Sequence, residues 1–444
     1  MSDELRPYPE YKDSGVPWLG RVPRHWKIKR AKNLFRCVDI RSKTGTEERL
    51  TVSAEYGVVP RSTMKVTMFE AQSYIGHKLC WPGDLVINSL WAWSRGLGVA
   101  RHHGLISSAY GVYRLSPNLV AYSDFIHHLV RSQAYHWELR TRSKGVWTSR
   151  LQLTDDAFLR APILLPPEDE AKTIARFIRG MGRRVNAFIR NRRLLIEVLN
   201  EQKQAIINRA VTRGLDPDIP LKPSGIDWLG DVPKDWQVIS FGRCIERIDQ
   251  GWSPVAAEGS FEDDQWAVLT LSCIRKGLFQ KEAMKPIAKE AKIPEHLEVS
   301  EGDLLISRSN TPQLVGDCCI VKDPRPRTII SDLIYRLRLR NCLLVPKFAL
   351  LWLLSSYARK QIQGDARGSS STMVKLSHGH IKRWKLAFPD TQTQEEIVKD
   401  VKGTIQPIDK SIIHAQQEID LVHEYRTRLI SDVVTGKVDV RHLA

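Results

Sequence analysis

The chain carries two copies of one sequence, and this duplication limits the folds that it can adopt. Residues 14–26, SGVPWLGRVPRHW, return as residues 224–236, SGIDWLGDVPKDW. From Leu153, which matches Leu376, to Asp216, which matches Asp439, the two copies keep a constant spacing of 223 residues. Copies of roughly 210 residues are too long for the short units of solenoids. We therefore expect two domains of the same fold, each with the same appendage.

The appendage is predicted to be helical. Prolines open it in each copy, within 164–174 (LLPPEDEAKTI) and 387–397 (AFPDTQTQEEI), and the acidic residues that follow suit the positive end of a helix. Apolar residues then recur at spacings of three and four, which is typical of helices that pack on each other. Gly180, Gly182, Gly403 and Pro407 predict a break near the front of each segment, so that the long helices run over about 183–213 and 407–435.

The rest of each copy is predicted to alternate strands with helices. Short bursts of β-branched residues predict strands within 51–59, 84–90, 111–115, 266–274, 303–309 and 328–339, because Gly, Pro and Ser bound them. Helices are predicted around 121–138 and 346–363. Each copy is therefore expected to be an α+β domain followed by a long helix.

Positive charge is concentrated in the first half of the chain. The net charge is +17; residues 1–214 hold 35 Lys or Arg against 19 Asp or Glu, whereas residues 215–444 hold 32 against 31. Such a surface attracts polyanions, so nucleic acid is the first partner to consider. No apolar run approaches the roughly 18 residues of a membrane-spanning helix, and the opening MSDELRPYPE does not resemble a signal peptide. We expect a cytoplasmic protein with no membrane partner.

Sequence signatures of catalysis are missing. The chain has no Gly-x-x-x-x-Gly-Lys phosphate loop, no Gly-x-Gly-x-x-Gly segment, no Gly-x-Ser-x-Gly elbow and no Asn/Asp-Pro-Pro-aromatic tetrapeptide of amino-methyltransferases. The adjacent pairs His102-His103 and His127-His128 are poorly spaced to hold one metal ion. We therefore predict no catalytic, cofactor-binding or metal-binding residue, and favour a binding protein over an enzyme.

The duplicated SG-x-x-WLG-x-VP-x-x-W segment is followed in each copy by a proline-then-helix segment, at 166–214 and 389–436. In this combination, over essentially the whole chain, the protein resembles the specificity subunit of a Type I restriction–modification enzyme. The resemblance implies target-recognition domains at 1–167 and 216–389, a central spacer helix region at 168–215 and a C-terminal spacer helix region at 390–444. The two helices are expected to pack as an antiparallel coiled coil.

The resemblance also implies how such a chain works. Each domain would read one half of a bipartite, asymmetric site on double-stranded DNA, and the helices would space the domains and dock two methyltransferase (modification) subunits. Restriction subunits would join later, and S-adenosylmethionine, ATP and Mg would belong to those partners, with no cofactor in this chain. Two alternatives stay open: a free-standing regulator that binds a bipartite DNA site, and an enzyme whose active site has no recognisable motif.

Residues that face DNA are expected in polar loops where the two copies differ. NSLWAWSRGLG of the first copy, for example, corresponds to SRSNTPQLVG of the second. Arg, Asn and Gln can pair with base edges, and Lys, Ser and Thr suit phosphates. The predicted DNA-binding residues are Trp91, Arg95, Arg101, Arg142, Lys144 and Arg150 in the first copy, and Arg308, Asn310, Gln313, Arg367, Ser370, Thr372 and Lys375 in the second.

Overall fold

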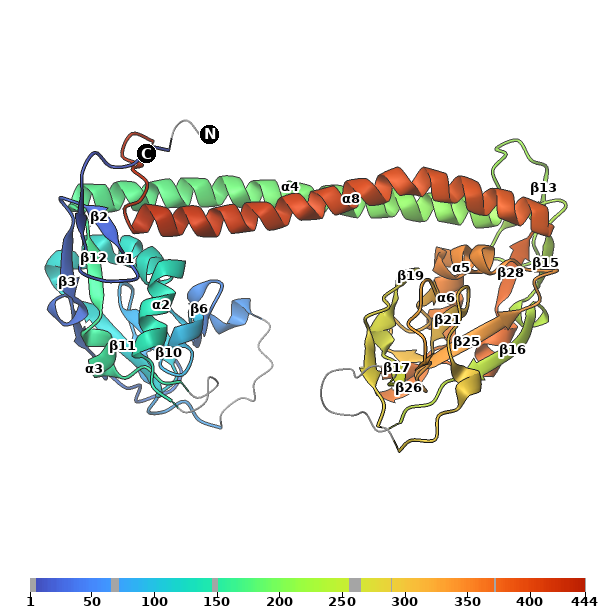
Figure 1. Cartoon of the computed structure of the whole chain (residues 1–444), viewed down its shortest axis with the longest axis horizontal. Helices are drawn as coiled ribbons and strands as arrows, with labels where there is room; N and C mark the ends of the chain where they lie inside the picture. The colour runs from blue at the N-terminus through green and yellow to red at the C-terminus, as the bar shows by residue number, and fades with distance from the viewer. Residues whose placement is uncertain are drawn as a thin grey trace. The chain divides into compact units, whose positions relative to one another are not determined.

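The chain folds into two compact units. The computed structural model describes residues 5–64, 72–145, 151–254, 265–288, 290–370 and 373–443, and over 368–370 the backbone only. Unit 1 comprises Met1–Arg192 and Gln416–Ala444, and unit 2 comprises Arg193–Ala415. Each unit therefore contains one copy of the duplicated domain together with parts of two long helices, α4 (Glu168–Arg213) and α8 (Thr391–Val434), which lie side by side (Figure 1).

Unit 1 is built on a four-stranded antiparallel sheet in the order β4-β11-β8-β9. Its central strand, β8, reads LVIN, and its three apolar residues are buried, because other elements cover the sheet. The other strands form two-stranded sheets, β1-β2, β3-β12, β5-β6 and β7-β10. The strands are β1 (Tyr11–Asp13), β2 (Arg21–Pro23), β3 (Lys27–Arg30), β4 (Phe35–Cys37), β5 (Leu50–Ser53), β6 (Gly57–Pro60), β7 (Lys78–Cys80), β8 (Leu85–Asn88), β9 (Leu97–Val99), β10 (Gly104–Ile106), β11 (Tyr110–Leu115) and β12 (Pro162–Leu165), with the helices α1 (Ser123–Val130), α2 (Gln133–Arg142) and α3 (Asp155–Leu159).

Unit 2 repeats this plan with the sheet β16-β25-β21-β23. It adds the three-stranded sheets β20-β17-β24 and β22-β27-β26, and the two-stranded sheets β13-β14, β15-β28 and β18-β19. The strands are β13 (Leu221–Pro223), β14 (Asp231–Pro233), β15 (Gln237–Ser240), β16 (Ile245–Gln250), β17 (Ala267–Leu269), β18 (Ile274–Arg275), β19 (Leu278–Phe279), β20 (Met284–Pro286), β21 (Leu304–Ser307), β22 (Ser309–Asn310), β23 (Cys318–Ile320), β24 (Thr328–Ile329), β25 (Ile334–Leu339), β26 (Arg367–Ser370), β27 (Met373–Lys375) and β28 (Lys385–Phe388), with the helices α5 (Pro346–Leu354), α6 (Ser356–Asp365) and α7 (His378–Arg383).

The expected α+β domains are confirmed, but two predicted helices are each divided in two. The helix predicted around 121–138 is α1 followed by α2, and the one around 346–363 is α5 followed by α6. The physical reason is a serine at each junction: Ser132 and Ser355 accept hydrogen bonds from the amides of Tyr135 and Ala358, both at 3.2 Å. A serine that caps the first turn of a new helix favours a fresh start over continuation.

The predicted break in the long helices is wrong. Helix α4 is continuous over 46 residues and α8 over 44, with Pro407 inside α8. Glycine costs a helix only about 1 kcal/mol relative to alanine, and buried apolar residues on both sides of Gly180 and Gly182, such as Ile178 and Val185, stabilise α4. Proline removes a single helical hydrogen bond, so a long helix held by packing can contain it.

Helices α4 and α8 run antiparallel, as expected. In unit 1 Arg426 donates to the amide oxygen of Asn186 at 3.2 Å, and Arg192 pairs with Glu418 at 2.7 Å. Residue numbers therefore rise along α4 while they fall along α8. In unit 2 Lys203 pairs with Asp409 at 2.6 Å, in the same sense.

Each unit includes the end of the helix that follows the other copy of the domain. In unit 2 Ala210 and Val211 of α4 belong to one buried cluster with Trp236 of the second copy. In unit 1 the chain after α8 turns at Gly436, whose φ of +75° suits a helix end, and its α-carbon lies close to Trp26 of the first copy. Trp236 therefore packs against the end of α4, and Trp26 lies beside the end of α8.

Candidate nucleic-acid interface

The first predicted residues lie on a tight loop between β8 and β9. The loop is closed by the amide of Gly96, which donates to the carbonyl of Trp91 at 2.8 Å, and Arg95 beside it has a left-handed φ of +61°. The side chain of Trp91 is 56% exposed and stacks on that of Trp93, with ring centroids 6.0 Å apart and 15° between the planes. The loop therefore presents an aromatic surface to solvent.

Lys144 is brought to the base of this loop. The backbone of Lys144 pairs with that of Gln152 through hydrogen bonds of 3.0 and 2.9 Å. The next amide, that of Leu153, donates to the carbonyl of Ser89 at 2.9 Å. Lys144 is exposed. Arg150 falls outside the described residues, so its placement stays a prediction.

Two other predicted residues are already paired with carboxylates. The Arg101 guanidinium lies 3.6 Å from the carboxylate of Asp124. Arg142 forms an ion pair with Glu138 one helical turn earlier, and this buried carboxylate also accepts a hydrogen bond from the indole of Trp18. A paired guanidinium gains less from a phosphate than a free one, so these two contacts favour a structural role. The sequence could have predicted the second ion pair, because Glu138 and Arg142 are four residues apart on one helix.

In unit 2 the predicted residues gather on the small sheet β22-β27-β26. Asn310 on β22 lies opposite Val374 on β27, and Lys375 on β27 lies opposite Arg367 on β26. Lys375 and Arg367 are both exposed. Residues that face each other across two strands project to the same side of the sheet, and two like charges in such a pair repel each other. An anion such as a phosphate between them would relieve that repulsion.

The remaining predictions for the second copy lie next to this sheet. The guanidinium of Arg308 donates to the carbonyl of Asp332 at 3.1 Å and lies 5.8 Å above the ring of Tyr335, so it is partly held by the protein. Gln313 is exposed. Ser370 is on β26, but its side chain is outside the described part, and Thr372 falls outside the described residues altogether.

The loop that follows β8 in unit 1 and the loop that follows β21 in unit 2 begin at equivalent backbone contacts. The amide of Leu376 donates to the carbonyl of Arg308 at 2.8 Å, as that of Leu153 does to Ser89. Leu153 and Leu376 match in the duplicated sequence, so the framework beneath the loops is shared. What differs is the set of side chains that each loop carries.

The sequence reasoning missed one face of α2. Trp137 is 49% exposed, and the guanidinium of Arg140 lies 5.6 Å above its ring. Burial lowers the pKa of His136, and the charges of Arg95 and Arg140 lower it further, so both cations lie near this face. The signal was available, because the second copy has Lys360 and Gln363 at the positions that match Trp137 and Arg140.

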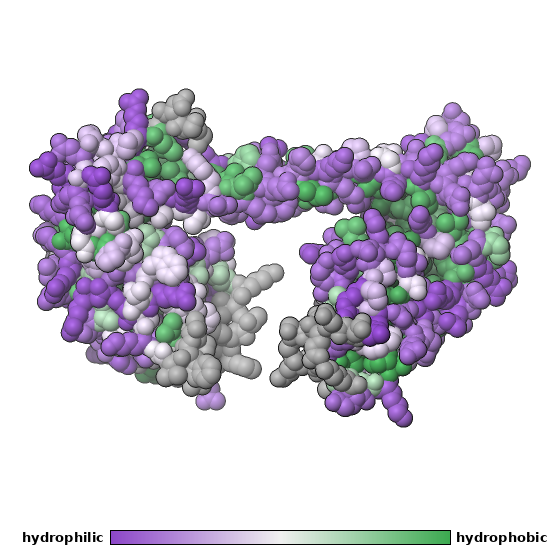
Figure 2. Space-filling view, viewed as in Figure 1, coloured by the Kyte–Doolittle hydropathy of each residue, from purple (hydrophilic) through white to green (hydrophobic). Residues whose placement is uncertain are grey.

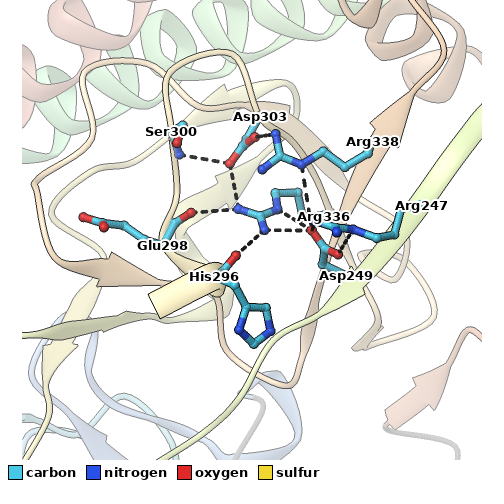
Figure 3. Close-up of polar contacts among 8 residues, drawn as sticks. All are labelled: Arg247, Asp249, His296, Glu298, Ser300, Asp303, Arg336 and Arg338. Carbon is cyan, nitrogen blue, oxygen red and sulfur yellow. Dashed lines mark hydrogen bonds and ion pairs between the residues drawn. The ribbon is translucent and has the colours of Figure 1, made fainter. Parts of the chain in front are cut away.

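An arginine–aspartate pair with a buried carboxylate is present at matching positions in both units. In unit 1 Arg114 donates to the carboxylate of Asp84. In unit 2 the matching Arg336 is fully buried and binds the carboxylates of Asp303 and Asp249 (Figure 3). The carboxylates of Asp84 and Asp303 also accept hydrogen bonds, from the backbone amides of Trp81 and Ser300 respectively, both at 2.9 Å.

The network in unit 2 has more partners than the one in unit 1. Arg336 also donates to the carbonyls of His296 and Glu298, both at 2.7 Å (Figure 3). Burial alone would raise the pKa of Asp249, but hydrogen bonds from Arg336 and Arg247 bring it below its ordinary value. Because its donors are saturated within the protein, Arg336 belongs to the framework.

Within the ranges described, no three His, Cys, Asp or Glu side chains are grouped to hold a metal ion. His127 is engaged otherwise, since its Nδ1 accepts the amide of Val99 at 3.2 Å. The helices in the described part of the chain include none that is long and apolar enough to cross a membrane.

Two curated proteins to which the chain is similar are specificity subunits of Type I restriction enzymes. No family model matches the chain. The specificity subunit of the Type I restriction enzyme EcoEI of Escherichia coli is 25% identical over 230 residues, which are 51% of this chain and 39% of that protein. The specificity subunit of EcoKI, from Escherichia coli strain K12, is 22% identical over 329 residues, or 72% of this chain and 67% of that protein. The chain thus aligns with about two fifths of the first relative and two thirds of the second.

One solved structure shares the fold. A chain from a study of complex assembly and conformational transition of the type I R-M system superposes with a TM-score of 0.64, over 93% of this chain and 98% of that one, at 17% identity. The duplicated domains, the antiparallel helices and the two curated relatives all indicate the same class of protein. In sequence the chain is therefore similar to the specificity subunits of Type I restriction–modification enzymes, and it shares its fold with a chain of the type I R-M system.

Proposed function

We propose that this chain recognises the DNA target of a Type I restriction–modification complex. Each unit binds one half of a bipartite, asymmetric site on double-stranded DNA, and α4 and α8 set the spacing between the two half-sites. The same helices dock two methyltransferase (modification) subunits, and restriction subunits join the full complex. S-adenosylmethionine, ATP and Mg are bound by those partners, and this chain carries out no catalytic step.

The observation that carries the proposal is a shared framework whose loops carry different side chains. Leu153 and Leu376 hold the bases of two loops through equivalent hydrogen bonds of 2.9 and 2.8 Å. Above them the first copy carries Trp91, and the second carries Asn310. Base edges are distinguished by such side chains, so two loops of different composition on one framework suit two different half-sites.

Charge supports DNA as the ligand. The excess of basic residues lies in the first 214 residues, with 35 Lys or Arg against 19 Asp or Glu. Cations that neutralise phosphates displace counterions, which makes the affinity for DNA fall with salt. In unit 2 the exposed cross-strand pair of Arg367 and Lys375 offers a place for one phosphate.

Exposed apolar side chains on the helices support partner docking. In unit 2 Leu194 and Val198 of α4 and Ile413 of α8 are 53%, 59% and 54% exposed. In unit 1 Leu421 of α8 is 64% exposed. Figure 2 shows hydrophobic side chains among the hydrophilic ones along these helices. Water-exposed aliphatic side chains on helices suit burial against another protein.

The test is to map methylated adenines in DNA from cells that express this chain with its modification subunits. We expect one bipartite motif with a fixed gap. Exchange of residues 27–165 for those of a relative with another target should then change one half-site, and leave the other half-site and the gap as they were. A chimera that altered both half-sites together would contradict the assignment of one unit to each half.

Two further measurements address the alternatives. The purified chain alone should transfer no methyl group from labelled S-adenosylmethionine and should not cut plasmid DNA with Mg; turnover that survived further purification would indicate an active site in this chain. A free-standing regulator would bind its bipartite site without modification subunits. We expect specific binding to require them.

A further inference from the structure

A single arginine holds two loops of unit 1 together. Arg131 lies between α1 and α2, and within the described part of the chain its guanidinium makes five hydrogen bonds, all of them to backbone carbonyls. The acceptors are the carbonyls of Ser53 (3.2 Å), Ala54 (2.9 Å), Glu55 (2.8 Å), Arg95 (3.4 Å) and Leu97 (2.6 Å). The first three belong to the turn between β5 and β6, and the last two to the end of the loop that carries Trp91.

The Arg131 side chain is half-buried and is bound by backbone carbonyls. Burial lowers the pKa of Arg131 to about 10, and the charge of Arg95 acts in the same direction. A guanidinium has five N–H donors in a fixed plane, and here carbonyl dipoles take the place that a carboxylate usually fills. Side chains of the two loops take no part. The anchor therefore fixes the backbone of the loop whatever residues the loop carries.

Unit 2 has an anchor of the same kind. Arg359 on α6 donates to the carbonyls of Val315 at 2.7 Å and Gln313 at 3.0 Å, which end the loop that carries Asn310. Burial lowers the pKa of Arg359 as well. Arg131, between α1 and α2, and Arg359, on α6, therefore both contact the loop that follows an inner strand of the main sheet. That strand is β8 in unit 1 and β21 in unit 2.

The two anchors are not equivalent positions of the duplicated sequence. The helix caps Ser132 and Ser355 are equivalent and also 223 residues apart, so that Arg131 matches Leu354 and Arg359 matches His136. A residue that only braced the shared fold would be expected at one matching position, as Arg114 and Arg336 are. Instead each unit uses an arginine at a different position, and each arginine binds the backbone of the loop that differs between the copies. Arg131 also binds the turn between β5 and β6.

We propose that Arg131 and Arg359 are positioning residues for DNA reading. Each holds the backbone of one recognition loop in a single conformation, and each is needed for discrimination in its own half-site only. This inference rests on the proposed function, since it assigns a role within the recognition of the two half-sites. Fixed geometry of this kind matters because hydrogen bonds to base edges depend strongly on distance and angle.

The test uses the full chain co-expressed with its modification subunits. The variants are Arg131→Lys and Arg359→Lys, which keep the charge but lose the planar fork of donors, with Arg131→Gln and Arg359→Gln as a second pair. Matched controls are Arg160→Lys and Arg383→Lys. Arg160 and Arg383 match each other in the two copies; both arginines are exposed and form ion pairs with Asp156 and Asp365.

The readout is the ratio of methylation rates on the correct duplex and on duplexes with one wrong base in either half-site. We expect Arg131→Lys to lower this ratio about tenfold, the order of magnitude of one lost base contact, for the half-site of the first domain alone. Arg359→Lys should do the same for the other half-site, and the controls should change neither. A merely structural role would lower thermal stability and total rate but not the ratio, so circular dichroism fixes a temperature at which each variant is folded.

Outcomes separate the positioning role from the proposed function. If the wild-type chain with its modification subunits gives no bipartite methylated motif, the positioning role and the proposed function are both wrong. If that motif is present but folded variants keep both ratios, or lose both together, the positioning role of these arginines is wrong and the proposed function stands.

Discussion

The guanidinium of Arg114 donates two hydrogen bonds to the carboxylate of Asp84, at 2.8 and 2.7 Å. Its counterpart Arg336 binds Asp303, at the matching position, and Asp249 in addition. Only 1% of the Arg336 side chain is exposed, against 28% for Arg114. The two copies therefore share an ion pair but place it at different depths.

This difference predicts unequal costs of mutation. Arg336→Met removes the buried partner of Asp249 and Asp303, which keep the more exposed Arg247 and Arg338. The loss should reduce the free energy of unfolding by about 3 kcal/mol. Arg114→Met should cost less, because the Arg114 side chain is partly exposed and solvent can enter the space that it leaves beside the single carboxylate of Asp84. Urea denaturation of both variants and of the unmodified chain measures the difference. Equal losses would show that depth of burial does not decide the cost.

Two half-buried histidines, His127 and His128, predict a loss of stability in mild acid. Burial lowers the pKa of His128 to about 4 and that of His127 well below its ordinary value; the charges of Arg101 and Arg131 also lower the pKa of His128, and Asp124 opposes them. The unfolded chain takes up these protons near the ordinary pKa of about 6.5, before the folded chain can. Stability of unit 1 should therefore be complete above that pH and fall as the pH goes from about 6.5 toward 4.

The measurement is thermal unfolding of the intact chain at several pH values in that range, compared with His128→Gln. The variant should show a shallower fall of Tm with acidification, because one of the protonation sites is gone. An identical pH dependence in both proteins would mean that His128 does not contribute. Asp249 and other carboxylates with lowered pKa lose their stabilising charge at lower pH and so lie outside this window.

The exposed apolar residues on α4 predict a docking defect. Leu194→Asp with Val198→Asp should reduce co-purification of the modification subunit at least about tenfold, because each removes apolar area and adds a charge to the proposed contact. Both side chains are more than half exposed, at 53% and 59%, so the fold should survive. Asn200→Asp, a nearby exposed position on the same helix, is the matched control. Unchanged co-purification would place the partner contact elsewhere.

The paired helices predict that the gap can be lengthened. Seven residues inserted in α4 near Arg193, with seven in α8 near Ala415, keep the apolar seam in phase and add about 10 Å at 1.5 Å per residue. The methylated motif should acquire a gap longer by roughly three base pairs, or methylation should fail, because one reader also turns about the duplex. Both half-sites should keep their sequence.

A two-residue insertion in each helix is the control, since it turns the apolar seam away from the partner helix and should abolish methylation. Insertion of seven residues in α4 alone should do the same, because pairs such as Lys203 with Asp409 lose their register. If the double seven-residue insertion left both affinity and gap unchanged, the helices would not set the spacing.

The duplicated sequence predicted the α+β domains and the antiparallel helices, because apolar periodicity and matched frames are properties of the sequence itself. It failed at Gly180 and Pro407, where local propensity favours a break but packing along the helix outweighs it. The prediction of single helices around 121–138 and 346–363 also failed, because Ser132 and Ser355 each cap the start of a second helix.

The candidate site could be predicted less well, because its geometry depends on contacts distant in sequence. Arg101 is paired with Asp124, which no local pattern reveals. Arg131 and Arg359 bind backbone carbonyls, and a carbonyl has no sequence signature. Comparison of the two copies was nevertheless informative, since residues that differ within a shared frame led to the loop of Trp91.

The membership of residues 416–444 in unit 1 sets an order on folding during synthesis. Unit 2 is one continuous segment and can close as soon as Ala415 has left the ribosome. Unit 1 must wait for the strand-like contact of Asp439 with Arg6 and for the turn at Gly436 beside Trp26. At 5–20 residues per second, the roughly 220 intervening residues take about 10–45 s to translate. Throughout that interval the nascent first domain lacks the contacts that residues 416–444 supply, so the part of the chain that is made first is completed last.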